Sequence, residues 1–140
     1  MKIAWVSFAV ALLALTGLAW AGESPAPAGA RVYIIWPKDG QVINGGKLWL
    51  RMGLKGAGIA PAGMEHPHTG HHHVLIDTVL PPFDEPVPFD KNHVHFGAGQ
   101  SEARIELSPG AHTLQVLFAD HDHVPHNPPL YSERISVIVP

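Results

Sequence analysis

Cysteine is absent from the 140-residue sequence, and this absence excludes several kinds of chemistry. No disulfide can form, and neither a thiolate metal site nor a cysteine nucleophile is available. Basic residues are also few, because nine Lys and Arg stand against twelve Asp and Glu, a formal charge of −3. No cluster of Lys and Arg is present. This charge pattern argues against binding to nucleic acid or to an anionic membrane surface.

The sequence contains only one long apolar run, and this run opens the chain. A short positive start precedes Ile3 to Trp20, and Ala19 and Ala21 are small residues at the two positions that a signal peptidase requires. We predict a signal peptide over residues 1–21 and a periplasmic or secreted protein with no membrane segment after cleavage. An uncleaved membrane anchor is the alternative, since the run is nearly long enough to cross a bilayer.

Glycine and proline divide the rest of the chain into short apolar segments with no helical period. Residues 22–30 are small and proline-rich, which predicts a flexible leader. Leu48, Leu50 and Met52 alternate with other residues, the period-2 pattern of a half-buried strand. The predicted strands are 31–36, 48–54, 72–78, 93–96, 103–107, 112–119 and 132–139, with loops at 56–70, 81–88 and 120–130. About seven strands in one domain, residues 31–140, predict an all-β fold, an immunoglobulin-like β-sandwich.

Histidine is strongly enriched in the middle of the chain. All eleven histidines lie between His66 and His126. Histidine is the commonest metal ligand in proteins and normally titrates between pH 5 and 8. Imidazole suits zinc, copper, nickel and iron, and copper has the highest intrinsic affinity among the common divalent metals. The enrichment therefore predicts a transition-metal site, with copper or zinc as the ion.

The alternation of side chains along a strand selects ligand candidates in two predicted strands. His93 and His95 are two residues apart in a predicted strand, so both imidazoles point to one face. His71 and His73 share a face by the same rule, whereas His72 falls on the face of Val74 and points inward. For an isolated His93 and His95 the alternative is two solvated surface histidines, and for residues 71–73 it is a loop end with no fixed direction.

The predicted loop 120–130 supplies three further candidates, His121, His123 and His126, among prolines that limit its freedom. Four acidic residues are expected to hydrogen-bond the second ring nitrogen of ligand histidines and so fix the tautomer. They are Asp120 and Asp122 of this loop, Asp77 and Glu102. His112 is expected to be structural, with its ring bonded to nearby backbone. His66 and His68 are assigned to a disordered loop. The predicted metal ligands are His71, His73, His93, His95, His121, His123 and His126.

Three linked motifs resemble one bacterial family. They are Gly70 to Asp77 (GHHHVLID), His93 to Glu102 (HVHFGAGQSE) and Leu107 to Val116 (LSPGAHTLQV), and they are similar to the domain of unknown function 4399 family. The resemblance implies an exported β domain and brings no established activity. His93-Val94-His95 also resembles the His-x-His pair at the copper of copper/zinc superoxide dismutases, which are β-sandwiches too, although their disulfide cysteines are absent here.

Three functions follow from these observations. The leading one is a metal-binding protein that buffers copper or zinc or delivers it to a partner protein. The second is a metal-dependent oxidoreductase of dismutase type, which needs an open coordination position. The third is a structural or partner-binding sandwich whose histidines sense pH. A metal-free hydrolase is disfavoured because Ser101 and Ser108 lack a Gly-x-Ser-x-Gly setting.

Overall fold

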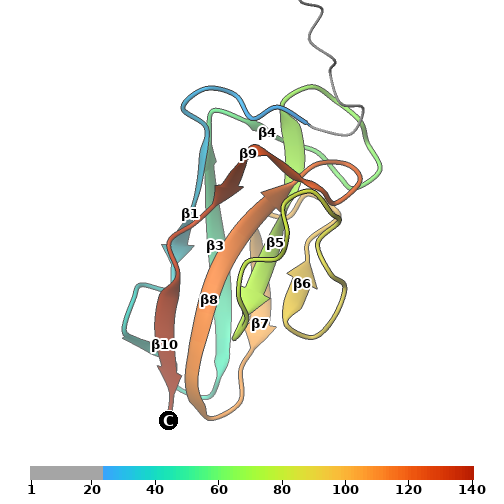
Figure 1. Cartoon of the computed structure of the whole chain (residues 1–140). Helices are drawn as coiled ribbons and strands as arrows, with labels where there is room; N and C mark the ends of the chain where they lie inside the picture. Colours follow the sequence, from blue (N-terminus) through green and yellow to red (C-terminus); the bar gives the residue numbers. More distant parts are fainter. Residues whose placement is uncertain (1–23) are drawn as a thin grey trace, which may run out of the picture.

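The computed structural model describes residues 24–140, which form ten β-strands and, within that range, no helix (Figure 1). The strands are β1 (Arg31–Trp36), β2 (Gln41–Val42), β3 (Lys47–Lys55), β4 (Gly58–Ile59), β5 (Thr69–Ile76), β6 (His93–His95), β7 (Glu102–Glu106), β8 (Gly110–Ala119), β9 (Pro125–Tyr131) and β10 (Ile135–Val139). The predicted signal peptide, residues 1–21, lies outside the described residues. Between residues 24 and 140 there is no helix long and apolar enough to span a membrane.

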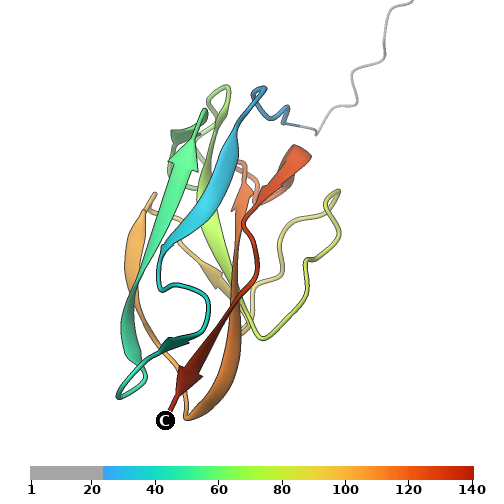
Figure 2. The same ribbon diagram turned by 90° about the vertical axis from the view of Figure 1, so that its left-hand side faces the viewer.

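The strands build two sheets, which confirms the predicted all-β sandwich (Figures 1 and 2). The first sheet has the order β1-β3-β7 and is antiparallel throughout. The second has the order β2-β10-β8-β5-β4, with β6 paired to β5 and β9 paired to β8. The central pair of the second sheet is β5 with β8, in an antiparallel register that places His72 opposite Phe118.

Every second side chain along the strands points into the space between the sheets and fills it. In β3, Leu48, Leu50 and Met52 are buried while the residues between them are exposed. Val74 and Val116 face them from the second sheet, and all belong to one hydrophobic core. Val74, Val116 and Leu50 are each 0% exposed, so this core alone buries enough apolar surface to fix which face of β5 points inward.

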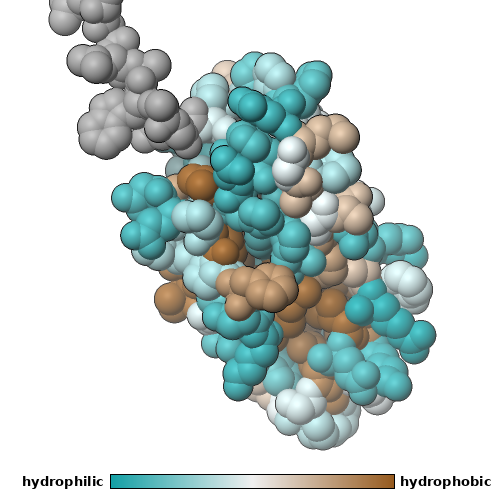
Figure 3. All heavy atoms as spheres, turned by 90° about the vertical axis from the view of Figure 1, so that its right-hand side faces the viewer, coloured by the Kyte–Doolittle hydropathy of each residue, from teal (hydrophilic) through white to brown (hydrophobic). Residues whose placement is uncertain are grey.

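The other face of the second sheet is covered by the long segment 77–92 between β5 and β6. Val87 and Leu80 of this segment pack on Leu75, Leu117 and Ala119, a small second cluster. Figure 2 shows the segment outside the second sheet. Figure 3 faces the side of the molecule on which β6 lies in Figure 1, and hydrophobic residues are visible there between hydrophilic ones. Outward-facing side chains of β5 are therefore buried as well, although they lie outside the main core.

Several stretches differ from the sequence-based expectation. The predicted loop 56–70 contains strand β4 and the first two residues of β5, because Gly58 and Ile59 pair in parallel with Thr69 and Gly70. The predicted loop 120–130 contains strand β9, because an edge strand that pairs irregularly with β8 tolerates prolines that cannot donate to a ladder. The described part of the predicted leader is hydrogen-bonded to β9, since Ala26 N–H donates to Asn127 O at 2.9 Å and Asn127 N–H donates to Ser24 O at 3.0 Å.

Candidate metal centre

Strand β5 carries two imidazoles on the outer face of the second sheet. His71 and His73 are 0% and 2% exposed, and their rings are 4.8 Å apart between centroids. His72, between them, points into the core, where its ring meets Phe118 edge-on at 5.3 Å. The inward direction predicted for His72 is confirmed. Because the core buries the inward face of β5, the side chains of His71 and His73 must point to the outer face of the sheet.

Strand β6 adds His95 directly beside this pair. His95 is the cross-strand partner of His73, and Val94 pairs with Val74. The ring of His95 lies 4.9 Å from that of His71 and 5.0 Å from that of His73. Gly97 leaves room for this ring, because a Cβ at Gly97 would lie 2.2 Å from His95 Cε1 and 2.5 Å from its Nε2. The sequence did not single out Gly97, whose only signal is its place two residues after the His-x-His pair.

The fourth imidazole comes from the connection between β8 and β9. His123 lies 4.7 Å from His95 and 5.0 Å from His71, measured between ring centroids. Its backbone has φ 68°, a left-handed conformation that side-chain-bearing residues rarely adopt. Its N–H donates to Asp120 O at 3.0 Å, and its carbonyl accepts from Val87 N–H at 2.9 Å. The loop is thus joined to both β8 and the covering segment 77–92.

The ring nitrogens converge on one point. His71 Nε2 lies 3.0 Å from His73 Nε2 and 3.1 Å from His95 Nε2. One ligand atom from each of His71, His95 and His123 lies within 4.8 Å of the others. Two imidazole nitrogens bound to zinc at about 2.0–2.1 Å would be about 2.9 Å apart at a right angle and about 3.4 Å apart at a tetrahedral angle. The His71–His73 and His71–His95 separations fall within this interval, and the His123 ligand atom lies farther out, within 4.8 Å of those of His71 and His95.

Hydrogen bonding alone does not satisfy this arrangement. A neutral imidazole has one N–H and one lone pair, so His71 Nε2 either donates or accepts. It therefore cannot form two separate good hydrogen bonds with His73 Nε2 and His95 Nε2. The buried Nδ1 atoms of His71 and His73 have no partner among residues 24–140, and an ion on the Nε2 side would leave them so. A cation at the centre would accept the lone pairs of all the rings at once, so the donor set fits a metal ion.

The surroundings of His71, His73 and His95 lower the pKa of each ring and so favour its neutral form. Burial, together with the neighbouring His95 and His123, lowers the pKa of His71 from 6.5 to about 4. Burial, followed by the proximity of His71 and His95, lowers the pKa of His73 to about 2. The pKa of His95 is lowered by burial and then by His123. Only the neutral ring offers a lone pair to a metal, so these shifts favour ligation at neutral pH.

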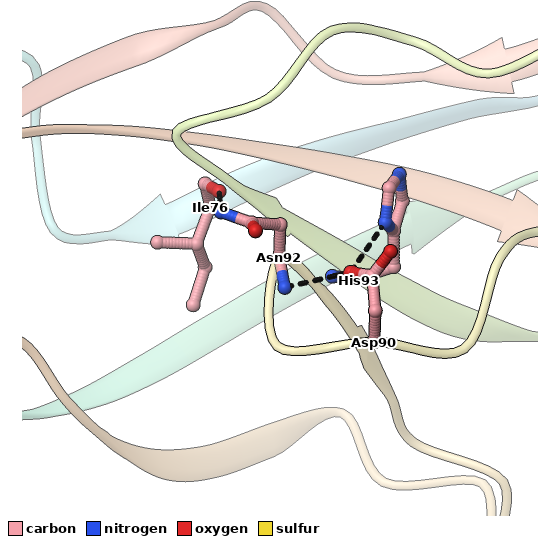
Figure 4. A network of polar contacts seen from close by, with 4 residues as sticks. All are labelled: Ile76, Asp90, Asn92 and His93. Atoms are coloured by element: carbon pink, nitrogen blue, oxygen red, sulfur yellow. Dashed lines mark hydrogen bonds and ion pairs between the residues drawn. The ribbon is translucent and has the colours of Figure 1, made fainter.

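His93 does not join the converging rings, although it lies on the same face of β6 as His95. Its Nδ1 lies 2.8 Å from Asp90 Oδ1, and the same oxygen accepts from Asn92 N–H at 2.8 Å (Figure 4). The side-chain amide of Asn92 donates to Ile76 O at 2.7 Å. These bonds hold the turn before β6. The hydrogen bond to His93 also lowers the pKa of Asp90.

The remaining histidines lie elsewhere. His121 Nε2 lies 3.4 Å from Asp122 Oδ2. His126 is stacked on Phe118, and its Nε2 donates to Thr69 O at 3.1 Å. His112 contacts Asp77 and the Ser108 carbonyl, in line with a structural role. Of the seven predicted ligands, the structure brings together His71, His73, His95 and His123 and leaves His93, His121 and His126 outside.

Comparison with known proteins adds a family match. The family described as "Domain of unknown function (DUF4399)" matches residues 50–140, which include all four converging histidines. No curated protein and no solved structure matches this chain. The match therefore places the histidine cluster within the family domain and leaves its chemistry to be argued from the residues.

Proposed function

This chain belongs to the DUF4399 family, and we propose that it binds one transition-metal ion through His71, His73, His95 and His123. The observation that carries the proposal is the approach of His73 Nε2 and His95 Nε2 to His71 Nε2, at 3.0 and 3.1 Å. Neutral rings cannot satisfy both contacts with hydrogen bonds, whereas a cation can. The rings come from β5, β6 and the β8–β9 loop, so only the folded chain assembles them.

Copper and zinc are the ions that this donor set favours. All four donors are imidazole nitrogens, which suit copper and zinc better than the oxygen-preferring magnesium or calcium. The chain has no cysteine, so no thiolate competes as a ligand. The pKa values of His71 and His73 lie well below neutrality, which leaves both lone pairs available near pH 7.

Buffering or delivery of the ion fits the site better than catalysis. A catalytic metal keeps an open position for water or substrate, as an oxidoreductase of dismutase type would require. Here the ligand atoms of His71, His95 and His123 lie within 4.8 Å of one another, and His73 Nε2, 3.0 Å from His71 Nε2, supplies the fourth nitrogen in our proposal. His71 and His73 are buried, while His95 and His123 are half-buried. The ion would therefore enter and leave past the last two.

The proposal includes export of the protein from the cytoplasm. The apolar run Ile3 to Trp20 followed by Ala21 has the form of a cleaved signal peptide. We expect the protein to hold copper or zinc in the periplasm or outside the cell and to pass it to a partner protein. N-terminal sequencing of protein from its native compartment should begin at Gly22. A first residue of Met1 would contradict the cleavage.

Isothermal titration of the metal-free protein with zinc and with copper(II) tests the proposal. We expect one site with a Kd of about 1 μM or tighter, or about −8 kcal/mol. His71→Ala should abolish this site, because His71 contacts all three other rings. His121→Ala is the matched control, since its ring lies on the same loop as His123 but outside the cluster. Absence of heat and of a thermal shift for both metals would refute the proposed function.

A further inference from the structure

We infer that Asp120 positions His123 for the metal ion and connects the metal centre to the N-terminal segment of the domain. This inference rests on the proposed function and goes beyond it, because Asp120 contributes no ligand atom. It acts through the backbone of the loop that carries His123. The N-terminal residues that contact Asp120 thereby influence how tightly the ion is held.

Asp120 closes the loop through four hydrogen bonds. Its Oδ1 accepts from the backbone N–H groups of Asp122 and Val124, each at 3.0 Å. Its own N–H donates to Val124 O at 2.9 Å, and its carbonyl accepts from His123 N–H at 3.0 Å. The side chain is 3% exposed, so water does not replace these bonds. The carboxylate therefore supplies two of the four hydrogen bonds that fix the shape of residues 120–124.

The shape that Asp120 imposes is the one that presents the His123 ring. At φ 68° the backbone of His123 is in a region that a residue with a Cβ adopts only when its surroundings hold it there. Without the carboxylate, the loop can relax to an ordinary negative φ. Such a change redirects the side chain, and the ring would leave its place 4.7 Å from that of His95.

The second carboxylate oxygen reaches the start of the domain. Ser24 Oγ–H donates to Asp120 Oδ2 at 2.7 Å, although 96 positions separate the two residues. Ser24 is itself held by Asn127 N–H, which donates to its carbonyl at 3.0 Å. Residues 24–26 thus lie along β9 and complete the contacts of Asp120. Removing the Ser24 hydroxyl should loosen the same loop that removing the carboxylate does.

A direct effect of the Asp120 charge is the alternative explanation. Burial lowers the pKa of His71, whereas the negative charge of Asp120 raises it. The charge of Asp120 therefore acts electrostatically on the cluster. Two variants separate the effects. Asp120→Asn removes the charge but keeps an Oδ1 that accepts both N–H groups. Asp120→Glu keeps the charge but moves the oxygens by one methylene, away from those groups.

The experiment measures zinc and copper(II) affinity for the wild type, D120N, D120E and S24A, with thermal unfolding as a check on folding. We expect D120N to lose less than about tenfold and D120E about 10–100-fold, with S24A between them. The electron paramagnetic resonance spectrum of copper-loaded D120E should match that of His123→Ala. The double variant D120E/H123A should bind no more weakly than H123A alone. Asp122→Asn changes only a side chain that takes no part in these carboxylate bonds, so this variant should bind like the wild type.

The outcomes are distinguishable. A wild type that binds neither metal overturns the proposed function together with this inference. A wild type that binds, with D120N weaker than D120E, overturns only the inference and assigns the effect to charge. Additive losses in D120E/H123A also overturn it. If D120E does not fold, D120N and S24A decide together, because retained affinity in D120N with a loss in S24A supports positioning, and any other combination contradicts it.

Discussion

His71 Nε2 and His95 Nε2 lie 3.1 Å apart, although their residues belong to different strands and are 24 positions apart in the chain. The contact exists because β5 and β6 pair in a register that sets His73 against His95. His71 is 0% exposed, so its ring cannot turn to water for a partner. A buried cluster of imidazoles that cannot satisfy one another destabilises the metal-free fold, unless a ligand uses their lone pairs.

A metal-binding site of this kind carries a cost in stability that a substitution should reveal. His73 has an unpartnered buried Nδ1 among the described residues, and leucine has a similar volume. We predict that His73→Leu raises the free energy of unfolding of the metal-free protein by about 1–2 kcal/mol and weakens metal binding. Denaturant titration and calorimetry measure both quantities. His93→Leu is the control, and it should leave metal affinity unchanged. A destabilised H73L would contradict this account.

Much of the fold was predictable, because periodicity reports burial directly. The strand 31–36 was predicted with its observed ends, and the alternation of Leu48, Leu50 and Met52 identified β3. Strand β9 was missed because its prolines at 125, 128 and 129 are typical of loops, and only its edge position explains them. The contacts of residues 24–26 with β9 depend on chain-distant partners that no local pattern reveals.

The candidate site was predictable in part. Parity assigned His71 and His73 to one face and His72 to the other, and the structure agrees. The same rule placed His93 beside His95 but could not show that Asp90 would bond its ring. For His121, His123 and His126 no parity rule applies, because their positions depend on the turn that Asp120 closes and on the start of β9.

Metal-free protein should lose stability as the pH falls. The pKa of His71 is about 4 in the folded state and about 6.5 in the unfolded state, so below pH 6.5 the unfolded chain binds more protons. The free energy of unfolding should therefore be highest above pH 6.5 and decrease towards pH 4, by up to about 1.4 kcal/mol per pH unit for each such ring. Denaturant titrations across this range measure the slope, which should be shallower in H73L. A flat profile in the wild type would contradict the neutral cluster.

The contribution of His112 to stability should have the opposite pH dependence, and it should decrease as the pH rises. Its Nδ1 donates to Asp77 Oδ2 at 2.6 Å and its Nε2 donates to Ser108 O at 2.7 Å, so both nitrogens carry protons. The hydrogen bond to Asp77 raises the pKa of His112, and the stabilisation it gives is present below pH 6.5 and is lost as the pH rises through the raised value. His112→Ala should cost about 1 kcal/mol near pH 6 and less near pH 9, a modest figure because the Asp77 side chain is 40% exposed. An equal loss at both pH values would show that the ring is neutral.

Gly97 should be required for metal binding but not for folding. A methyl group there would overlap the His95 ring, which lies at the half-buried side of the cluster and can move outward. We predict that Gly97→Ala lowers the metal affinity about 10–100-fold while the thermal midpoint changes little. Titration of G97A with zinc, beside His95→Ala, measures the effect. Wild-type affinity in G97A would mean that the ring does not occupy its observed place when the ion is bound.

X-ray absorption spectroscopy of the protein loaded with one equivalent of zinc tests the central claim most directly. If His71, His73, His95 and His123 hold the ion, the first shell should contain four nitrogens at about 2.0–2.1 Å with the outer-shell pattern of imidazole rings. The His95→Ala variant should lose one of these rings. A first shell of water or carboxylate oxygens without imidazole scattering would contradict the claim that these four histidines form a metal centre.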